Sequence, residues 1–381
     1  AGDAALTEVA IAQLKEQFPH SRITLAMDDP SSHAGDGEAI DSLYGLVKNG
    51  DQWSIGGLVQ LLPATLLPIL TYRLLGSTVP VFTPRRWRSV IQAYTQANLV
   101  VSKPGGFLYS SGRGVSLLIS IYTLGLAQLA GKPVYLLPQS IGPLSRWWEH
   151  AALTQVLGRA RMVMVREPIS LHQLEAWGLP AGSYRLLPDP AFSYPSAPAS
   201  SAKEWLQKHN IESCDEAPLL GMTAINWEAM NPRFEGQTRY ETACAETARL
   251  FVERYGGKVI LFPQVRGPVS SQDDRVPARR IADRLHELSS SILLVEEPIA
   301  AEHLKAIYGL MSLFVGTRMH SNIFALSEGV PVVAIGYQPK TRGILKMMGL
   351  EEWAIGIDEV TPQSMSKKLM DLWDAQEEVR T

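Results

Sequence analysis

Short apolar runs alternate with stretches of helical pattern along most of the chain. Runs of strand length lie at 23–27, 99–102, 134–137 and 162–165 in the first half, and at 219–225, 259–262, 292–295, 311–315 and 332–335 in the second. Helical patterns separate most of these runs, and Gly or Pro ends several of them. This alternation predicts βαβ units, and therefore parallel sheets covered by helices.

One interruption divides the pattern into two parts. Residues 193–202 are rich in Ser, Pro and Ala and show no periodicity, which is typical of a linker. We therefore expect an α/β protein of two doubly wound domains facing a cleft, at 1–192 and 203–360. The amphipathic tail at 361–381 predicts a final helix.

The segment 40–83 is less regular. It contains an apolar stretch at 57–70 that Pro63 and Pro68 interrupt. A membrane span needs about 20 apolar residues with few interruptions, so we expect a packed helical insertion here. The alternative is a membrane-facing or oligomer surface.

Composition narrows the classes of function. The 381 residues are 46% hydrophobic and 19% charged, which fits two folded domains and excludes wholesale disorder. The net charge is −3 without a block of Lys or Arg, which argues against nucleic-acid binding. Two unrelated cysteines, Cys214 and Cys244, and the absence of a His-x-x-x-His pair predict a reducing, cytoplasmic setting and no metal. Because the chain starts without Met and directly in a helical pattern, we expect that it lacks its natural N-terminal residues.

The candidate chemistry follows two of the buried strands. Arg318 and His320 come after the run at 311–315, where a helix should begin, and Lys340 follows the run at 332–335. In a parallel sheet these strand ends face the same way, and a helix N-terminus favours an anion. The pattern predicts a pocket for a small, multiply negative substrate. Alternatively, Arg318 pairs with a neighbouring element and His320 is a hydrogen-bonded core histidine.

Residues 316–340 resemble the C-terminal signature of the polysaccharide pyruvyl transferase family, which is Arg-x-His, a helix with Ala and Gly-x-Pro, and then Tyr-x-x-Lys. The resemblance extends over most of the chain, through Gly2-Asp3-Ala4-Ala5, Gly105-Gly106, Gln139-Ser-Ile-Gly-Pro143, Arg166-Glu167 with Ser170, Pro188-Asp189-Pro190-Ala-Phe192, Pro263-Gln264 and Asp273-Asp274. Ser140 departs from the glycine of the family pattern. The order and spacing of these pieces make the resemblance specific.

The resemblance implies transfer of pyruvate from phosphoenolpyruvate to two hydroxyls of a sugar as a cyclic ketal, in polysaccharide or cell-surface glycan synthesis. It implies a GT-B-like fold of two Rossmann-like domains, with the acceptor on the N-terminal half and the donor on the C-terminal half. The helix at 361–381 would then cross back onto the N-terminal domain. Phosphoenolpyruvate is a co-substrate and no cofactor is expected. The acceptor is a sugar or glycan, free or lipid-linked, and the enzyme is cytoplasmic or peripheral to a membrane, monomeric or a homo-oligomer.

Residue roles follow from the same resemblance. His320 is the expected general acid, and Arg318 holds the phosphate or carboxylate as charge shifts. The remaining candidates are Lys340, Arg166, Arg266, Ser321 and Asn322 for the donor, and Asp3, Gly105, Gly106 and Gln139 for the acceptor. For Arg166 the alternative is a helix-start residue that pairs with Glu167 or another neighbour.

Two other functions remain open at this point. A glycosyltransferase or sugar-nucleotide epimerase would keep the fold and bind a nucleotide sugar at the same helix start. A non-catalytic glycan-binding protein would use the cleft without chemistry.

Overall fold

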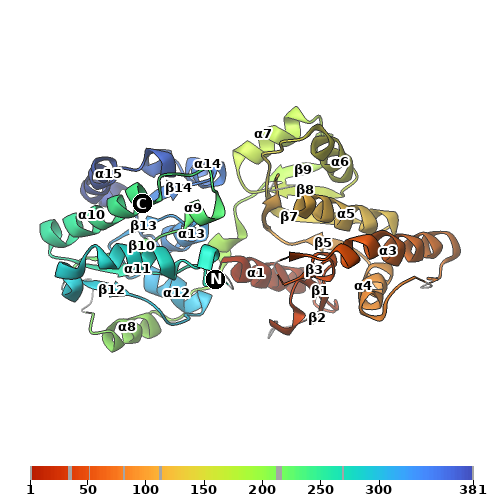
Figure 1. The fold of residues 1–381 in the computed structure, drawn as a ribbon, viewed down its shortest axis with the longest axis horizontal. Coiled ribbons are helices and arrows are strands. Elements are labelled where there is room, and N and C mark those ends of the chain that lie inside the picture. The colour runs from red at the N-terminus through yellow and green to blue at the C-terminus, as the bar shows by residue number, and fades with distance from the viewer. Residues whose placement is uncertain are drawn as a thin grey trace. The chain divides into compact units, whose positions relative to one another are not determined.

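A computed structural model of the chain describes residues 2–32, 37–50, 52–79, 82–110, 114–211, 217–267 and 270–379. The chain forms two compact units (Figure 1). Unit 1 contains the residues up to Val9 together with Pro190–Thr381, and unit 2 contains Ala10–Asp189. The boundary at 189/190 lies close to the expected one, but the first half of the N-terminal helix belongs to unit 1.

Unit 1 is built on a parallel sheet of six strands. Its strands are β10 (Leu219–Thr223), β11 (Lys258–Leu261), β12 (Ile292–Leu294), β13 (Leu313–Gly316), β14 (Val332–Gly336) and β15 (Ala354–Gly356). They lie in the order β12-β11-β10-β13-β14-β15. The chain first moves outward from β10 and then returns to place β13 beside β10. Ligands of such α/β sheets bind at this reversal point, outside the carboxyl ends of the strands.

Helices cover both faces of this sheet. They are α8 (Ala199–Lys208), α9 (Trp227–Met230), α10 (Gln237–Tyr255), α11 (Arg275–Asp283), α12 (Ala301–Tyr308), α13 (Met319–Ser327), α14 (Pro339–Met347), α15 (Pro362–Asp374) and α16 (Gln376–Val379). Helix α10 packs beside α15 and α11 on one face, and α8 packs beside α12 on the other (Figure 1). Strands β10 and β13 are buried throughout, which explains their apolar runs.

Two expectations about unit 1 are wrong. The segment 193–202 is not a free linker, because α8 begins within it at Ala199 and Ala202 is buried in the core of the unit. The C-terminal helix, expected on the N-terminal domain, belongs to unit 1 instead. Its apolar residues Met365, Leu369 and Leu372 lie in the core of unit 1. The ring of Trp373 stacks on that of Tyr255 in α10, with 4.2 Å between the ring centroids.

Unit 2 has a smaller sheet. Strands β5 (Val100–Ser102), β7 (Val134–Ile141), β8 (Met162–Val165) and β9 (Tyr184–Leu186) are parallel in this order, and β6 (Gly105–Leu108) also pairs with β7. The predicted strand at 23–27 exists as β1 (Thr24–Met27), but it pairs with β2 (Glu38–Asp41) in a separate small sheet. A short antiparallel pair, β3 (Lys48–Asn49) and β4 (Gln52–Trp53), completes the strands.

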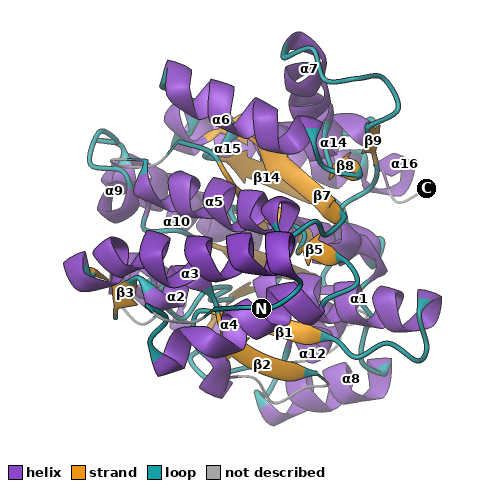
Figure 2. Ribbon diagram, turned by 90° about the vertical axis from the view of Figure 1, so that its right-hand side faces the viewer, coloured by secondary structure: helices purple, strands orange, loops and turns teal. Residues whose placement is uncertain are grey.

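The helices of unit 2 are α2 (Leu43–Leu46), α3 (Ile55–Leu75), α4 (Arg85–Gln96), α5 (Val115–Leu129), α6 (Trp147–Gly158) and α7 (Pro168–Ala176), together with the second half of α1 (Gly2–Gln17). The apolar stretch is helical as expected, and α3 lies alongside α4 and α5 (Figure 2), although apolar residues such as Ile55 and Leu74 are exposed. Among the described residues, α3 is the one helix long and apolar enough to cross a membrane, and one third of its most apolar window is buried in the protein.

Candidate active site

The candidate site lies where β13 gives way to α13, beside the reversal point of the unit 1 sheet. Strand β13 ends at Gly316, and Arg318 precedes α13 in extended conformation. A Cβ on Gly316 would lie only 1.6 Å from Oδ1 of Asn322. Glycine is therefore required, because the first turn of α13 folds back onto the strand end.

Arg318 forms a bidentate ion pair with Asp274. Its Nη2 donates to Oδ1 at 2.6 Å, and its Nε lies 3.2 and 3.1 Å from the two carboxylate oxygens. Asp274 is buried and also accepts a hydrogen bond from the Val265 N–H at 2.8 Å. Because it directly precedes α11, Asp274 connects the loop after β11 to the guanidinium. Two parallel N–H···O contacts fix the plane of that guanidinium.

The pair is oriented, and Arg318 is held as a cation. Burial lowers the pKa of the Arg318 guanidinium, but Asp274 and Tyr337 raise that pKa by more, and the net shift is upward. Burial raises the pKa of the Asp274 carboxyl, and Arg318 opposes this rise. Arg318 therefore remains a cation whose direction is set by a buried carboxylate.

His320 is the second residue of α13 and packs against the first turn of α1. A Cβ on Gly2 would lie 2.3 Å from Nδ1 and 2.5 Å from Cγ of the imidazole. Only glycine allows this approach, and Nε2 of His320 is buried. The motif Gly2-Asp3 thus belongs to the same site as His320. The expectation that Asp3 lies in the N-terminal domain is wrong, since its backbone is part of unit 1; its side chain lies outside the described structure.

Arg266 and Lys340 follow other strands of the same sheet. Arg266 lies in the loop after β11. Its backbone pairs with that of Asp273 in an isolated antiparallel β-bridge, next to Asp274. Its Nη1 is buried without a hydrogen-bond partner among the described residues. Such an unsatisfied cationic donor in a candidate site favours an anionic ligand. Lys340 is partly exposed in the first turn of α14, directly after β14.

Ser321 and Asn322, two of the expected donor residues, are buried and packed against neighbouring elements. Ser321 is fully buried, donates to the Arg318 carbonyl at 2.6 Å, and pairs with the Thr223 hydroxyl at 2.9 Å. Asn322 is 1% exposed and packs on Gly316. Side chains this deeply buried hold the end of β10 against the start of α13.

Arg166 in unit 2 is also buried and paired. It is 1% exposed, and it donates to Asp189 at 2.6 Å and to the Ser140 hydroxyl at 2.8 Å. Glu167 accepts from Ser170 N–H at the start of α7 instead. The structure therefore supports the alternative, a helix-start arginine that pairs with a neighbour. Ser140, the departure from the family pattern, is one of its partners.

The expected acceptor residues of unit 2 do come together. Gly105 lies opposite Gln139 in the pairing of β6 with β7, and Gly106 follows in β6. The Gln139 amide nitrogen donates to the Lys103 carbonyl, and the Gln139 side chain is fully buried. Gln139 thus holds the turn that presents the two glycines.

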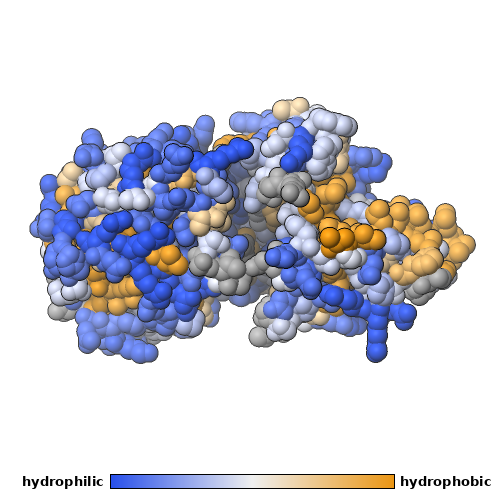
Figure 3. Space-filling model, in the orientation of Figure 1, coloured by the Kyte–Doolittle hydropathy of each residue, from blue (hydrophilic) through white to orange (hydrophobic). Residues whose placement is uncertain are grey.

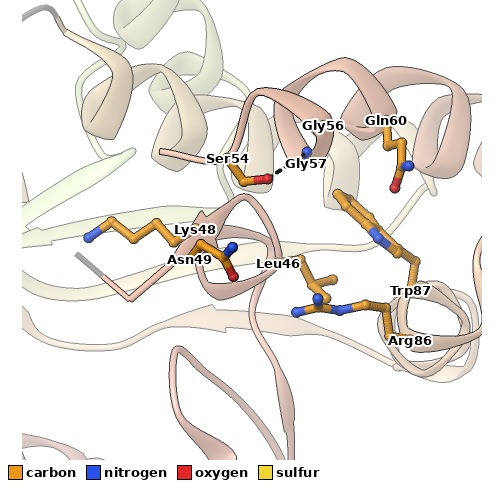
Figure 4. A pocket seen from close by; sticks show the side chains of 9 residues that line it. All are labelled: Leu46, Lys48, Asn49, Ser54, Gly56, Gly57, Gln60, Arg86 and Trp87. Atoms are coloured by element: carbon orange, nitrogen blue, oxygen red, sulfur yellow. Dashed lines mark hydrogen bonds between the residues drawn. The ribbon is translucent and has the colours of Figure 1, made fainter. Parts of the chain in front are cut away.

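A separate pocket of about 250 Å³ opens elsewhere in unit 2 (Figure 4). It contains none of the predicted site residues. Its lining consists of Leu46, Lys48, Asn49, Ser54, Gly56, Gly57, Gln60, Arg86 and Trp87. No group of His, Cys, Asp or Glu in the described ranges has the geometry of a metal site.

Sequence reasoning missed two contacts of the predicted site. Asp274 is the carboxylate that pairs with Arg318, and Gly2 is the residue against which His320 packs. Asp273-Asp274 and Gly2-Asp3 both appeared in the motif pattern. Neither signal says which distant residue it meets, because each pairing depends on the tertiary fold.

Comparison with known proteins agrees with the motif pattern. A family model described as polysaccharide pyruvyl transferase matches residues 1–339. The amylovoran biosynthesis protein AmsJ of Erwinia amylovora is 27% identical over 261 residues, which cover 66% of this chain. The match spans 61% of the length of AmsJ.

Solved structures resemble the fold at low identity. A UDP-N-acetylglucosamine 2-epimerase has a TM-score of 0.61 and 11% identity, covering 99% of this chain and 87% of the other. The UDP-GlcNAc 2-epimerase of Neisseria meningitidis bound to UDP-GlcNAc has a TM-score of 0.56 and 11% identity. The match covers 99% of this chain and 90% of the epimerase chain. These likenesses confirm the α/β fold of two Rossmann-like units, of GT-B type, and carry no information about the ligand of this chain.

Proposed function

The chain belongs to the polysaccharide pyruvyl transferase family, and on that basis we propose that it transfers pyruvate from phosphoenolpyruvate to two hydroxyls of a sugar. The product is a cyclic ketal on a polysaccharide or another cell-surface glycan. The likeness to AmsJ, an amylovoran biosynthesis protein, supports a role in glycan synthesis. The observation that carries the proposal is the oriented Arg318–Asp274 pair next to His320 at the sheet reversal point.

Charge balance supports this donor. Phosphoenolpyruvate carries a phosphate and a carboxylate, while the Arg318–Asp274 pair is neutral as a whole. The additional positive charge would come from Arg266, Lys340 and protonated His320. An arginine has five N–H donors, so Arg318 can hold Asp274 and still contact the phosphate. The buried Nη1 of Arg266 supports a second contact to an anionic group of the donor.

The chemistry requires a proton at the methylene carbon of the donor. In the proposed mechanism His320 gives its proton to that carbon, and a sugar hydroxyl adds to the neighbouring carbon, which carries the phosphate. His320, now neutral, accepts the proton of the hydroxyl. The second hydroxyl then displaces the phosphate, which leaves with the electron pair of its C–O bond and takes up the second proton. Arg318 and Arg266 stabilise the phosphate as negative charge builds on it.

The direct test is incubation with phosphoenolpyruvate and a panel of sugar acceptors. Released phosphate and the pyruvyl ketal, detected by mass spectrometry, should appear in equal amounts. His320→Ala should lower the rate by roughly 10²- to 10⁴-fold while the protein stays folded. Near-normal rates in folded His320→Ala and Arg318→Ala proteins would contradict the assignment of these residues.

A second experiment distinguishes the other two functions. At 100 times its dissociation constant a ligand stabilises the folded state by about 2.7 kcal/mol, so thermal unfolding identifies the donor class. We expect stabilisation by phosphoenolpyruvate and none by nucleotide sugars. Stabilisation by nucleotide sugars alone would favour a glycosyltransferase or epimerase. Glycan binding without phosphate release would favour a non-catalytic protein.

A further inference from the structure

Helix α3 presents an apolar face to solvent. Its exposed apolar residues, which form this apolar face, are Ile55, Val59, Leu62, Leu67, Leu74 and Leu75. Ile55 is 80% exposed and Leu74 is 79% exposed. Figure 3 shows hydrophobic residues gathered over the region where Figure 1 places α3. A contiguous apolar surface that faces solvent is expected to be an interaction site.

The sequence around this face is strongly basic. The 97 residues from Gln52 to Trp148 contain eight Lys and Arg residues and no Asp or Glu, although the whole chain has a net charge of −3. Arg85, Arg86 and Arg88 begin α4, which packs on α3, and Arg73 lies in the last turn of α3. None of these four arginines has an acidic partner among the described residues. The partner of the apolar face is therefore expected to be anionic.

The pocket of unit 2 adjoins the apolar face. Ser54, Gly56 and Gln60, which line it, are neighbours of Ile55 and Val59 in the chain. Arg86 reaches the pocket from α4 (Figure 4). A cationic hollow beside an apolar strip matches the arrangement of a lipid phosphate and its acyl chains.

Helix α3 is held against unit 2 by its opposite side. Leu61, Ala64 and Ile69 are buried there, and the Thr65 hydroxyl lies 2.6 Å from the Tyr122 hydroxyl. The Thr83 hydroxyl donates to the Ala64 carbonyl at 3.0 Å. A helix packed in this way can immerse only its outer side, which is the arrangement of a helix that lies in a membrane interface.

We propose that the apolar face of α3 and the arginines at the start of α4 bind the surface of an anionic lipid bilayer, with α3 lying along the interface. This inference rests on the proposed function and adds that the reaction takes place at a membrane surface. It does not depend on the donor, because its readout is binding and not catalysis.

Vesicle flotation of the 381-residue chain tests the proposal. Phosphatidylcholine vesicles are compared with vesicles that also contain phosphatidylglycerol, at low and at high salt. The protein should float with the anionic vesicles and be released by salt, because exposed charge interactions are screened. Absence of flotation with anionic vesicles, or equal flotation with both vesicle types, would overturn the proposal.

Variants separate the apolar and the basic contributions. Val59→Glu should weaken binding on the order of tenfold, since it removes buried hydrocarbon. The triple variant R85Q/R86Q/R88Q should weaken it on the order of 100-fold, at about fivefold for each charge near the surface. Met348→Glu is the matched control, an exposed apolar residue of unit 1, and should bind as the unmodified chain does.

Size-exclusion chromatography with light scattering tests whether a second copy of the chain covers the apolar face of α3. The unmodified chain should elute without an α3-dependent dimer. If the unmodified chain forms a stable dimer that Val59→Glu dissociates, and if the unmodified chain does not float with anionic vesicles, the face belongs to a second copy of the chain and the membrane proposal is overturned.

Discussion

Arg318 in unit 1 and Arg166 in unit 2 occupy similar places in the chain pattern. Each follows a strand, precedes a helix, and forms an ion pair of 2.6 Å with an aspartate. Their surroundings differ. Arg166 follows β8, which lies between β7 and β9, its neighbours in the chain order, and its side chain is 1% exposed. Arg318 follows β13, which lies beside β10 at the reversal point, and its side chain is 11% exposed.

The comparison shows that an arginine after a buried strand is not by itself a functional signal. At a reversal point the chain diverges on the two sides and leaves space beyond the strand ends. Between strands that are consecutive in the chain, the neighbouring segments fill that space, as Ser140 and Asp189 do around Arg166. We therefore expect Arg166 to contribute to stability and Arg318 to take part in the proposed chemistry.

The largest effect is expected when the ion pair of Arg166 is removed, and it concerns the stability of unit 2. Asp189→Ala leaves Arg166 buried without its carboxylate, which should lower the free energy of unfolding by about 3–5 kcal/mol. Urea unfolding followed by hydrogen exchange of unit 2 amides measures the change. The double variant Arg166→Met/Asp189→Leu should recover most of the loss, because it removes both charges. A loss under about 1 kcal/mol in the single variant would contradict a structural role for the pair.

The next effect is on activity and concerns Arg318. Arg318→Ala should lower kcat/KM for pyruvyl transfer by roughly 10²- to 10³-fold, the usual cost of losing a donor that stabilises developing charge. The double variant Arg166→Met/Asp189→Leu, measured per folded molecule, is the control and should retain its activity. Equal losses in the two proteins would remove the functional distinction between the two arginines.

Asp274 is expected to act as a positioning residue. Asp274→Asn keeps the shape of the side chain but weakens its hold on Arg318, so kcat should fall roughly tenfold to 100-fold. KM for phosphoenolpyruvate should stay the same or fall, because the site gains one unit of positive charge. Steady-state kinetics provide both constants. If the variant loses stability but keeps its kcat, Asp274 is only structural.

The smallest effect concerns the pH dependence of unit 2. Burial would raise the pKa of Glu149, but hydrogen bonds from Ser110, Arg146 and the Ser145 N–H lower it below its ordinary value. Ionised Glu149 therefore stabilises the fold above its unfolded pKa, and this stabilisation is lost as the pH falls through its folded pKa. Glu149→Gln should lower the melting temperature near neutral pH. The difference from the unmodified chain should stay constant from neutral pH to about pH 5 and shrink as the pH falls below about 4.3, the ordinary pKa of Glu. A difference that stays constant below this pH would contradict this origin.

Local patterns predicted the elements that depend on neighbouring residues. The alternation of apolar runs and helical stretches predicted β10, β11, β13 and β14 within a few residues of their bounds. Arg318 and His320 were correctly placed at a helix start after a strand, because both features lie within a few residues in the chain. The prediction of a linker at 193–202 was wrong. Ala202 in this segment is buried in the core of unit 1, and the composition of the segment does not show this.

The sequence by itself determined the βαβ order, the parallel sheets, the position of the Arg318–His320 motif and the family of the protein. Only the tertiary structure decided the partners. Arg318 meets Asp274, 44 residues earlier in the chain, His320 meets Gly2, and α15 meets α10. Periodicity shows that a helix has an apolar side, and an Arg shows that a counter-ion is needed. Which distant segment supplies the apolar surface or the counter-ion depends on the folding of the whole unit.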